Sequence, residues 1–496
     1  MALFLLLLPL ALKIDFAQND DWVYYNMVQA FMRRNFTLDP ISAPTFYLQG
    51  FLGAGFALIF GLQRLPVLTL LVSVVNLFVF VLLAKKITKD TLLSILLGLL
   101  LFFNPLYIYS TWSFMTEQYF LLFTTLALFF IYDYTTAPSS KSFALANVFI
   151  LLAFFIRQLA FVTSLAFGMY LLLKKKWKEG LTQLGLFTAL FMFYTFIFPK
   201  TAEMFEKPLE FKHLLEFSYA YSLTYAILLY ICAFTFPVIL FVLKIPSKKR
   251  LVPIFAGLAI MAFILLNKYF DPHKLAWGEF YYLDNVLERK GFFPRGIDGT
   301  KYFFKGMYDL YRHWDTIAKV FAAFLVTYLV VRPKKLVNIF AVFIVTYISV
   351  MLVTQKVYDR YLLVLVELAI LFMVSGVKKV PTLKELILVP FILFLAFYSY
   401  QFSMDFILLN SYVWNKGEEI SSTLNIDRRD IMGTNSWKLL NQNPLHNYKY
   451  IFTFDSYVTK PELKCCWTLV ETKDIIFPYS LFINPKIYLY GSNILY

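Results

Sequence analysis

Apolar residues recur along the chain in long runs that are separated by short polar connections. A bilayer core about 30 Å thick needs roughly 20 apolar residues per helix, so each run predicts a membrane-spanning helix. The predicted spans are residues 1–14, 66–84, 91–110, 113–132, 143–157, 159–173, 181–199, 218–243, 251–267, 316–331, 336–354, 361–377 and 384–403. Residues 1–14 lack the basic start and small-residue cleavage site of a signal peptide, so we expect an anchored span there. The pattern predicts an α-helical polytopic membrane protein with about 13 transmembrane helices.

Lysine and arginine concentrate in every second connection between these runs. The basic connections lie near residues 85–90, 133–142, 174–179, 244–250, 332–335 and 378–385. Positive residues mark cytoplasmic loops, so these connections are predicted to be cytoplasmic and the others to face outward. This topology accounts for the net charge of +15, and no nucleic-acid partner is indicated.

The composition agrees with a membrane protein. Hydrophobic residues make up 60% of the chain and charged residues 16%, whereas soluble domains have about 45–50% and about 25%. This excess excludes a soluble enzyme, a disordered chain and a disulfide scaffold. The three cysteines are Cys232, Cys465 and Cys466. They form no CxxC pair and so suggest no zinc site, and the last two are either a strained disulfide or two thiols.

Four outward-facing segments are long enough to carry a function, namely 15–65, 200–217, 268–315 and 404–496. The first contains two stretches, near 26–32 and 51–61, that suit interfacial helices lying on the membrane. The loop 268–315 mixes charged and aromatic residues, which is typical both of sugar sites and of any long amphiphilic loop. The tail contains alternating stretches at 448–454 and 486–490, which predict β-strands. We expect a transmembrane module over 1–403 and a small extracytoplasmic domain of mixed or β character over 404–496.

Two adjacent carboxylates, Asp20 and Asp21, follow the first span, and Tyr24 comes soon after them. Repulsion between adjacent carboxylates raises the pKa of one of them and suits it to accept a proton. Asp is also a common N-cap of a following helix. Both interpretations are open at this point.

Other charged residues lie at predicted outer boundaries. Glu117 is just inside the outer end of a span, where an ionisable residue indicates either a functional site or a first-turn acid that complements the helix dipole. Arg157 interrupts an apolar stretch, and Arg360 is followed by Tyr361 at a later boundary. An Arg beside Tyr is either an interfacial anchor or a fork that grips a lipid phosphate.

Several of these features together resemble a known family. They are an acidic pair followed by Tyr24 just past the first span, a proline leading into a second interfacial helix, an Asn-Pro turn before Thr116 and Glu117, and an Arg-Tyr-Leu sequence at Arg360. The chain resembles the GT-C membrane glycosyltransferases, within them the protein O-mannosyltransferase and aminoarabinose (lipid A) transferase-like group. Motifs carry the resemblance over about 15–135, and architecture alone carries it over about 140–400.

The resemblance implies a glycosyltransferase that uses a polyprenyl-phosphate sugar donor on the outer face and inverts the anomeric centre. It implies that Asp20 is the base, with Asp21 where Glu is usual and Glu117 a looser match to a second acidic position. Tyr24 matches a residue that approaches the donor phosphate, and Arg157 and Arg360 with Tyr361 are the candidates to bind that phosphate. Ser42 and Ala43 replace the acid-lysine pair of aminoarabinose transferase-like members. No metal ligand is therefore assigned, although a divalent metal stays open.

The acceptor is a lipid, a glycan or a protein, and membrane lipids are further partners. We expect a prokaryotic plasma membrane with the active site on the outer face. The alternative functions are a lipid-linked oligosaccharide flippase and a polysaccharide polymerase or ligase. A flippase needs polar residues along a path across the membrane, whereas the charges in these spans lie mostly near the predicted outer face. The pattern favours an outer-face transferase.

Overall fold

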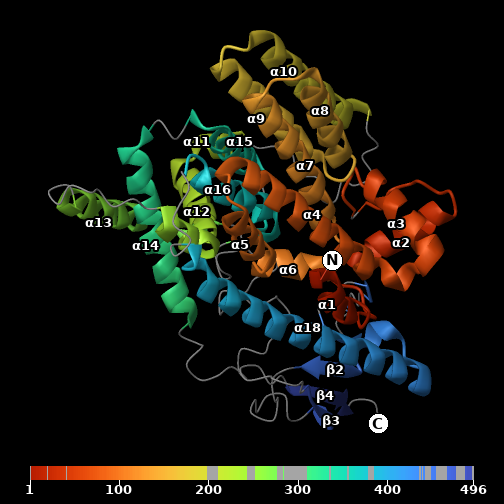
Figure 1. Ribbon diagram of the computed structural model, residues 1–496. Coiled ribbons are helices and arrows are strands. Elements are labelled where there is room, and N and C mark those ends of the chain that lie inside the picture. Colours follow the sequence, from red (N-terminus) through yellow and green to blue (C-terminus); the bar gives the residue numbers. More distant parts are fainter. Residues whose placement is uncertain are drawn as a thin grey trace.

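The computed structural model describes residues 2–18, 20–40, 42–197, 211–242, 252–275, 283, 310–333, 337–354, 357–377, 385–434, 437, 440–441, 448–453, 466–475 and 486–493. Within these residues the chain is mostly helical, and a small β-sheet lies near the C-terminus (Figure 1). Most of the segments 200–217 and 268–315, together with Cys465, lie outside the described residues.

Each predicted apolar run overlaps a helix or a pair of helices. The first half of the chain contains α1 (Ala2–Ala11), α2 (Asp21–Met32), α3 (Tyr47–Phe60), η1 (Leu62–Arg64), α4 (Leu65–Thr88), α5 (Thr91–Phe102), α6 (Pro105–Thr111), α7 (Thr116–Thr136), α8 (Ser140–Phe154), η2 (Gln158–Ala160), α9 (Phe161–Leu173), α10 (Trp177–Met192) and η3 (Phe193–Ile197). The second half contains α11 (Lys212–Leu215), α12 (Phe217–Val242), α13 (Val252–Lys268), η5 (Pro272–Lys274), α14 (Leu310–Val331), α15 (Ile339–Val353), η9 (Asp359–Leu362), α16 (Leu363–Val374), α18 (Leu388–Leu424) and η10 (Arg428–Asp430).

Four helices among the described residues are long and apolar enough to cross a membrane, namely Leu62–Thr88, α7, α12 and α18. Helices α5 and α6 pass the same test as a pair and are bent by 69° at the break between them, which gives up to five candidate spans. Other apolar helices, such as α1 and α8, have 10–17 residues. These helices support an integral membrane protein, and the number of thirteen crossings stays a prediction.

The bend between α5 and α6 has a local cause in the sequence. Asn104 caps α6 by accepting a hydrogen bond from the backbone N–H of Leu106 at 2.9 Å, and Pro105 occupies the first turn. Asn at the cap and Pro at the first position both favour a new helix start. Helix α6 is also tied to α18, because Nε1 of Trp112 donates to Oγ of Ser403 at 2.8 Å.

Helices α2 and α3 lie side by side at one edge of the molecule (Figure 1). They confirm that the segment 15–65 contains two helices, and α3 begins four residues earlier than the predicted stretch at 51–61. The close approach depends on Gly53 of α3. A Cβ atom at this position would lie 2.8 Å from Val28 of α2 and 2.5 Å from Phe114. The side chain of Phe114 is fully buried, so it has little room to move.

We expect Gly53→Ala to destabilise the protein by about 1–3 kcal/mol, because the added methyl group overpacks the contact between α2, α3 and Phe114. The matched control is Gly55→Ala on the same helix, where an added Cβ atom meets nothing within 4 Å. That control is expected to keep or raise stability, since Ala favours a helix over Gly. Thermal unfolding of the detergent-solubilised protein checks both variants, and equal melting temperatures for the two would contradict this account of the packing.

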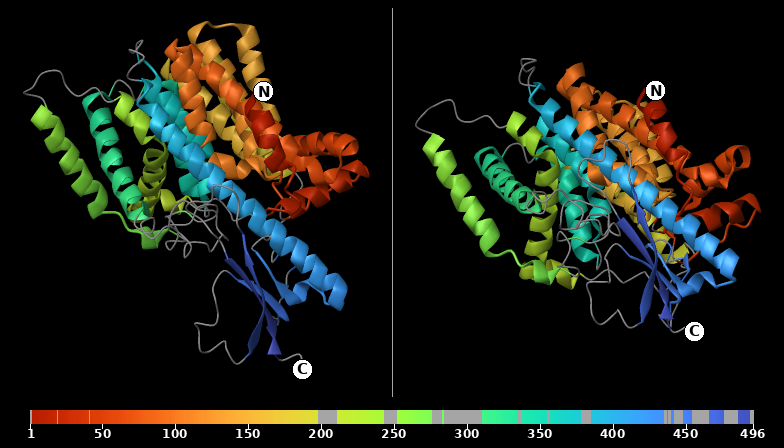
Figure 2. Two further views of the ribbon diagram at one scale, coloured as in Figure 1. Left: turned by 60° about the horizontal axis from the view of Figure 1, so that its bottom comes forward. Right: turned by 90° about the horizontal axis from the view of Figure 1, so that it is seen from below.

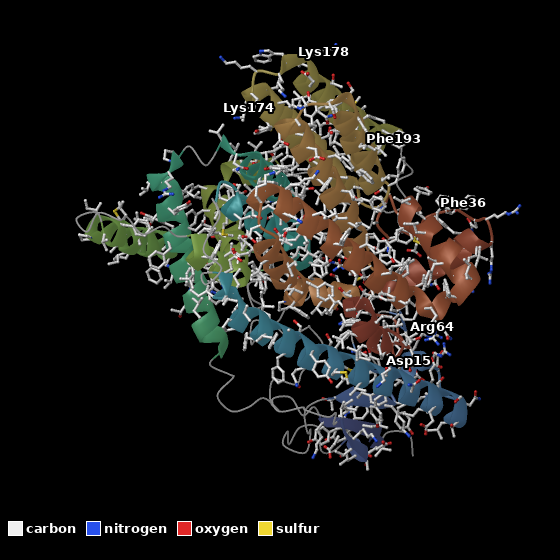
Figure 3. All side chains as sticks on the ribbon, viewed as in Figure 1. Asp15, Phe36, Arg64, Lys174, Lys178 and Phe193 are labelled. Carbon is white, nitrogen blue, oxygen red and sulfur yellow. The ribbon has the colours of Figure 1, made fainter. Side chains whose placement is uncertain are left out.

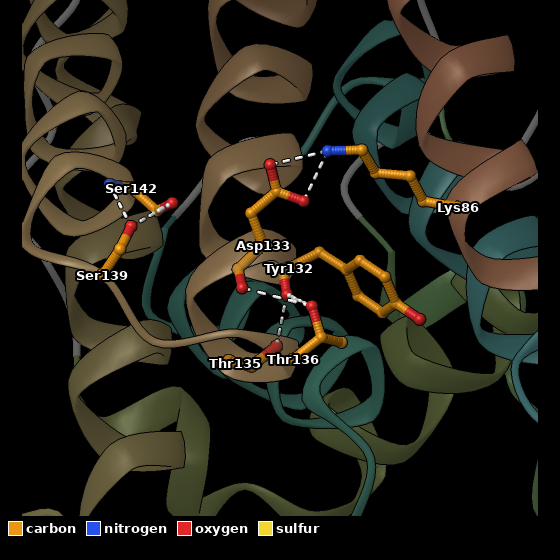
Figure 4. Close-up of polar contacts among 7 residues, drawn as sticks. All are labelled: Lys86, Tyr132, Asp133, Thr135, Thr136, Ser139 and Ser142. Carbon is orange, nitrogen blue, oxygen red and sulfur yellow. Dashed lines mark hydrogen bonds and ion pairs between the residues drawn. The ribbon is translucent and has the colours of Figure 1, made fainter.

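The two ends of α7 carry different sets of polar residues. Near its C-terminus Asp133 pairs with Lys86 of α4, with 2.6 Å between Nζ and Oδ2 (Figure 4). Glu117 lies at the N-terminus of the same helix. A helix of 21 residues is about 30 Å long, which matches the thickness of a bilayer core. Lys174 and Lys178, from another basic connection, lie at one edge of the molecule, far from Asp15 and Arg64 (Figure 3).

Helix α18 has 37 residues and continues without a break across the boundary predicted at 403/404. Its last part lies against the small sheet (Figure 2). The hydroxyl of Tyr412 donates to Glu471 of the sheet at 2.8 Å. On the N-terminal side of the chain, the carboxylate of Asp15 accepts hydrogen bonds from Ser411 and Asn415 at 2.6 and 3.0 Å. The tail is therefore joined to the helical region by a continuous helix.

The sheet has four strands in the order β1-β2-β4-β3. The strands are β1 (Ile431–Met432), β2 (Tyr450–Thr453), β3 (Trp467–Asp474) and β4 (Lys486–Ser492). Strands β1 and β2 are parallel, whereas β4 pairs antiparallel with both β2 and β3. Strands β2 and β4 coincide with the stretches predicted from alternation. Strand β3 was not predicted, because its residues are mostly exposed and show no alternation of apolar and polar positions.

Candidate active site

The predicted site residues come from four distant parts of the chain and meet at the ends of helices. Asp20 precedes α2, Glu117 lies in the first turn of α7, Arg157 lies between α8 and η2, and Arg360 lies in η9 before α16. The structure brings all four together. We refer to Asp20, Glu117, Arg157 and Arg360 as the charged cluster.

Glu117 is at the centre of the charged cluster. Its Oε1 atom lies 3.4 Å from Nη1 of Arg157 and 3.4 Å from Nε of Arg360. The three side chains are 3%, 14% and 11% exposed, respectively. Burying a charge is costly unless an opposite charge lies close to it. The two arginines therefore compensate Glu117, and their burial argues against an interfacial anchor as the role of Arg360.

Asp20 is at the more open side of the charged cluster. Its Oδ2 atom lies 3.8 Å from Nη2 of Arg360, and its side chain is 30% exposed. Asp20 stands at the N-cap position of α2, but its side chain makes no capping hydrogen bond. The N-cap interpretation is therefore wrong for this side chain. Burial raises the pKa of Asp20, Arg360 opposes that rise, and the charge of Glu117 adds to it.

Asp21 has a different environment from its neighbour. It is 1% exposed, and its Oδ2 atom accepts hydrogen bonds from the backbone N–H groups of Phe114 at 3.1 Å and Gln18 at 3.3 Å. Burial raises the pKa of Asp21, and the two backbone hydrogen bonds oppose this. Its side chain joins the start of α2 to the turn before α7, so it holds the segment that carries Asp20 beside the segment that carries Glu117.

We expect Asp21→Ala to cost about 1–3 kcal/mol of stability, because two backbone N–H groups lose their acceptor inside the protein. Asp21→Asn keeps an acceptor oxygen of the same size and is expected to fold like the native chain. Thermal unfolding of the two variants distinguishes them. If Asp21→Ala unfolded at the same temperature as Asp21→Asn, the joining role of this carboxylate would be wrong.

Aromatic rings surround the two guanidinium groups. The Cζ atom of Arg157 lies 4.5 Å from the ring centre of Tyr361, and that of Arg360 lies 5.4 and 5.6 Å from the rings of Tyr358 and Tyr361. Tyr24 is also buried, and burial raises the pKa of its hydroxyl. Guanidinium groups stack favourably on aromatic faces. The rings thereby help to hold both guanidinium groups in place.

A small hollow opens beside the charged cluster. Its lining consists of Glu117, Phe120, Leu121, Arg157, Leu159, Arg360, Tyr361, Leu363 and Val364. The charged side chains and the phenol of Tyr361 thus share this hollow with five apolar residues from α7, η2 and α16. Such a lining suits a molecule that has an anionic group next to a hydrocarbon chain.

The site includes residues that sequence reasoning did not assign. Met115 contacts the cluster, because Nη1 of Arg360 lies 3.4 Å from its sulfur atom. Gln49 of α3 is fully buried and donates through Nε2 to the backbone carbonyl of Phe114 at 2.8 Å. The position of Gln49 inside an apolar helix was a signal in the sequence, since a buried amide needs a partner. Nothing in the sequence distinguishes Met115 from a core methionine.

No group of three or more His, Cys, Asp and Glu side chains in the described part of the chain could hold a metal ion. The two carboxylates of the charged cluster, Asp20 and Glu117, both face guanidinium groups. Within the described residues, Asp20 and Glu117 are therefore each paired with arginine.

No protein-family description matches the chain, and no curated protein matches it. Among solved structures, the chain is similar to the crystal structure of ArnT from Cupriavidus metallidurans in the apo state. The two are 12% identical with a TM-score of 0.36, over 99% of this chain and 97% of ArnT. A likeness at this level leaves the function to be argued from the geometry of the site.

Proposed function

We propose that this chain is a membrane glycosyltransferase of the GT-C type, which transfers a sugar from a polyprenyl-phosphate donor to an acceptor hydroxyl. One observation carries the proposal. The charged cluster, in which Asp20 is partly exposed and the other three side chains are largely buried, lies at helix ends beside a hollow whose remaining lining is largely apolar. Two guanidinium groups beside an apolar surface match the phosphate and the hydrocarbon chain of such a donor.

The phosphate-binding role falls to Arg157 and Arg360. Each guanidinium presents several N–H donors in a fixed plane, and phosphate oxygens accept them in pairs. The charge of the leaving phosphate increases as the bond to the sugar breaks. Cations already held in place by Tyr358 and Tyr361 would stabilise that charge without reorganisation.

Asp20 is the proposed general base. It would take the proton of the acceptor hydroxyl while the acceptor oxygen bonds to the anomeric carbon. The bond between that carbon and the phosphate oxygen breaks at the same time, and polyprenyl phosphate leaves. Attack from the face opposite the phosphate inverts the configuration. The partial exposure of Asp20 leaves its carboxylate accessible to an acceptor, which a general base requires.

The partners and location follow from the same proposal. The donor lipid and the membrane lipids are the hydrophobic partners, and the acceptor is a lipid, a glycan or a protein. We place the charged cluster on the outer face, because Lys86 and Asp133 lie at the other end of α7 in connections that the charge pattern assigns to the cytoplasm. A prokaryotic plasma membrane is the proposed location.

Proteoliposomes that contain the purified protein and a polyprenyl-phosphate sugar test this function against a flippase. A transferase converts the donor to free polyprenyl phosphate when an acceptor is present, whereas a flippase moves intact donor between leaflets. We expect conversion without movement of intact donor. Movement of intact donor without conversion would contradict the proposal.

A further inference from the structure

The carboxylate of Glu117 occupies the space between two guanidinium groups without forming a hydrogen bond to either. Both ion-pair distances are 3.4 Å. Within the described residues, Oε1 and Oε2 of Glu117 and Nε of Arg360 are buried and have no hydrogen-bond partner. Well-formed pairs between Arg and carboxylate have aligned N–H···O bonds of about 2.7–2.9 Å. Glu117 therefore balances the charges of the arginines but does not satisfy their donors.

The net charge around Glu117 affects whether a phosphate can bind there. The groups that surround Glu117 are Asp20 before α2, Asp21 and Tyr24 of α2, Arg157 next to η2, and Arg360 and Tyr361 of η9. Two guanidinium groups face the carboxylates of Asp20 and Glu117, and Asp21 is a third acid nearby, so the site has no net positive charge when Asp20 and Glu117 are ionised. A phosphate that enters such a buried site adds an uncompensated negative charge, which is unfavourable.

We propose that Glu117 is an internal substitute for the donor phosphate, which the phosphate displaces from Arg157 and Arg360 on binding. This inference rests on the proposed function and adds a regulatory role to one residue of the same site. In the empty protein, the carboxylate keeps two cations neutral in a place where they would otherwise repel each other. A phosphate has more acceptor oxygens than a carboxylate, so it can satisfy donors of both arginines at once.

The hollow beside Glu117 has a volume of about 10 Å³, so the exchange requires the side chains that line it to move. It is lined by Glu117 itself and by both arginines, so the carboxylate can leave the guanidinium groups by rotating its side chain. Displacing Glu117 lowers the affinity of the site for phosphate. Part of the interaction between phosphate and arginine replaces an existing ion pair, so the native site binds phosphate less tightly than the same arginines would without Glu117.

Equilibrium binding of farnesyl phosphate to the detergent-solubilised full chain tests this proposal. Glu117→Gln removes the competing charge and keeps the size of the side chain. We expect it to lower the Kd for farnesyl phosphate about tenfold, while sugar transfer does not improve in proportion. Glu117→Asp keeps the charge on a shorter side chain and is expected to give a Kd between those of Glu117→Gln and the native chain. This second variant tests the proposal even if Glu117→Gln does not fold.

The matched control is Asp133→Asn, which removes the carboxylate of an ion pair at the other end of α7 and is expected to leave the Kd unchanged. Melting temperature gives a second measurement. Without ligand, Glu117→Gln is expected to melt lower than the native chain because two buried guanidinium groups lose their counter-charge. Farnesyl phosphate is then expected to raise its melting temperature more than that of the native chain.

The outcomes separate this inference from the proposed function. An unchanged or higher Kd in both Glu117 variants, together with weaker binding in Arg157 and Arg360 variants, would overturn the substitute role and leave the phosphate site intact. If neither the Glu117 nor the arginine variants altered the binding of farnesyl phosphate, the phosphate site itself would be wrong, and both proposals would fall.

Discussion

Asp20→Asn is expected to lower the rate of sugar transfer by about 10²–10⁴-fold, because the amide cannot accept the proton of the acceptor hydroxyl. Binding of the donor is expected to change little, since Arg157 and Arg360 stay in place. The native rate should fall on acidification at a higher pH than for an exposed aspartate, because burial raises the pKa of Asp20 and the protonated form is inactive. Initial rates of transfer measured across a pH series check both statements.

Asp39→Asn is the control for this prediction, because Asp39 belongs to the same outer segment and is not part of the charged cluster. It is expected to keep the native rate and the native pH profile. Full transfer activity in Asp20→Asn would show that another group accepts the proton. A pH profile that was the same for Asp20→Asn and the native chain would lead to the same conclusion.

Arg360→Lys is expected to weaken binding of a polyprenyl phosphate by about 10- to 100-fold. The lysine keeps a positive charge near Glu117, but it loses the planar fork that contacts Glu117, Asp20 and Met115. Each hydrogen bond to a charged group contributes about 1.5–3 kcal/mol, which corresponds to this range of Kd. Arg157→Lys is expected to act in the same direction. Equilibrium binding of farnesyl phosphate measures both.

Arg428→Lys is the matched control, because Arg428 forms an exposed ion pair with Glu418 at 2.6 Å, away from the hollow. Exposed ion pairs contribute little to stability, so this variant should resemble the native chain in both melting temperature and affinity. Native affinity in both Arg157→Lys and Arg360→Lys would mean that phosphate binds elsewhere.

The long apolar runs predicted where helices form. Each apolar run became a helix because a chain in lipid must satisfy its backbone hydrogen bonds internally. The number of crossings did not follow as directly. Several helices, such as α1 with 10 residues and α16 with 12, are shorter than the roughly 20 residues that a span requires. The pattern marks apolar segments, whereas length in the folded chain depends on caps and breaks such as Asn104-Pro105.

The grouping of charged residues at the candidate site was predictable from ionisable residues at membrane boundaries. An ionisable residue at a membrane boundary needs a partner of opposite charge. In the structure, ion-pair contacts connect Asp20, Glu117, Arg157 and Arg360. The different surroundings of the two adjacent aspartates were not predictable. Asp20 and Asp21 are adjacent in sequence, but successive residues at a helix start point in different directions, so one faces Arg360 and the other faces backbone amides.

The continuation of α18 past the boundary predicted at 403/404 could not be predicted for a related reason. Hydropathy falls after about residue 403, but α18 continues to Leu424 as a helix that carries the sheet. Contacts from distant residues accompany that extension, among them the hydrogen bonds from Ser411 and Asn415 to Asp15. Local composition contains no information about such long-range partners.

The release of free polyprenyl phosphate from a polyprenyl-phosphate sugar tests the central claim most directly. The purified native chain and Asp20→Asn are incubated with the donor and a mixture of lipid, glycan and peptide acceptors in detergent, and the released lipid phosphate is quantified. Release by the native chain, reduced at least about 100-fold in Asp20→Asn, is the predicted result. Equal release by the native chain and Asp20→Asn would contradict the assignment of Asp20 as the general base of this site.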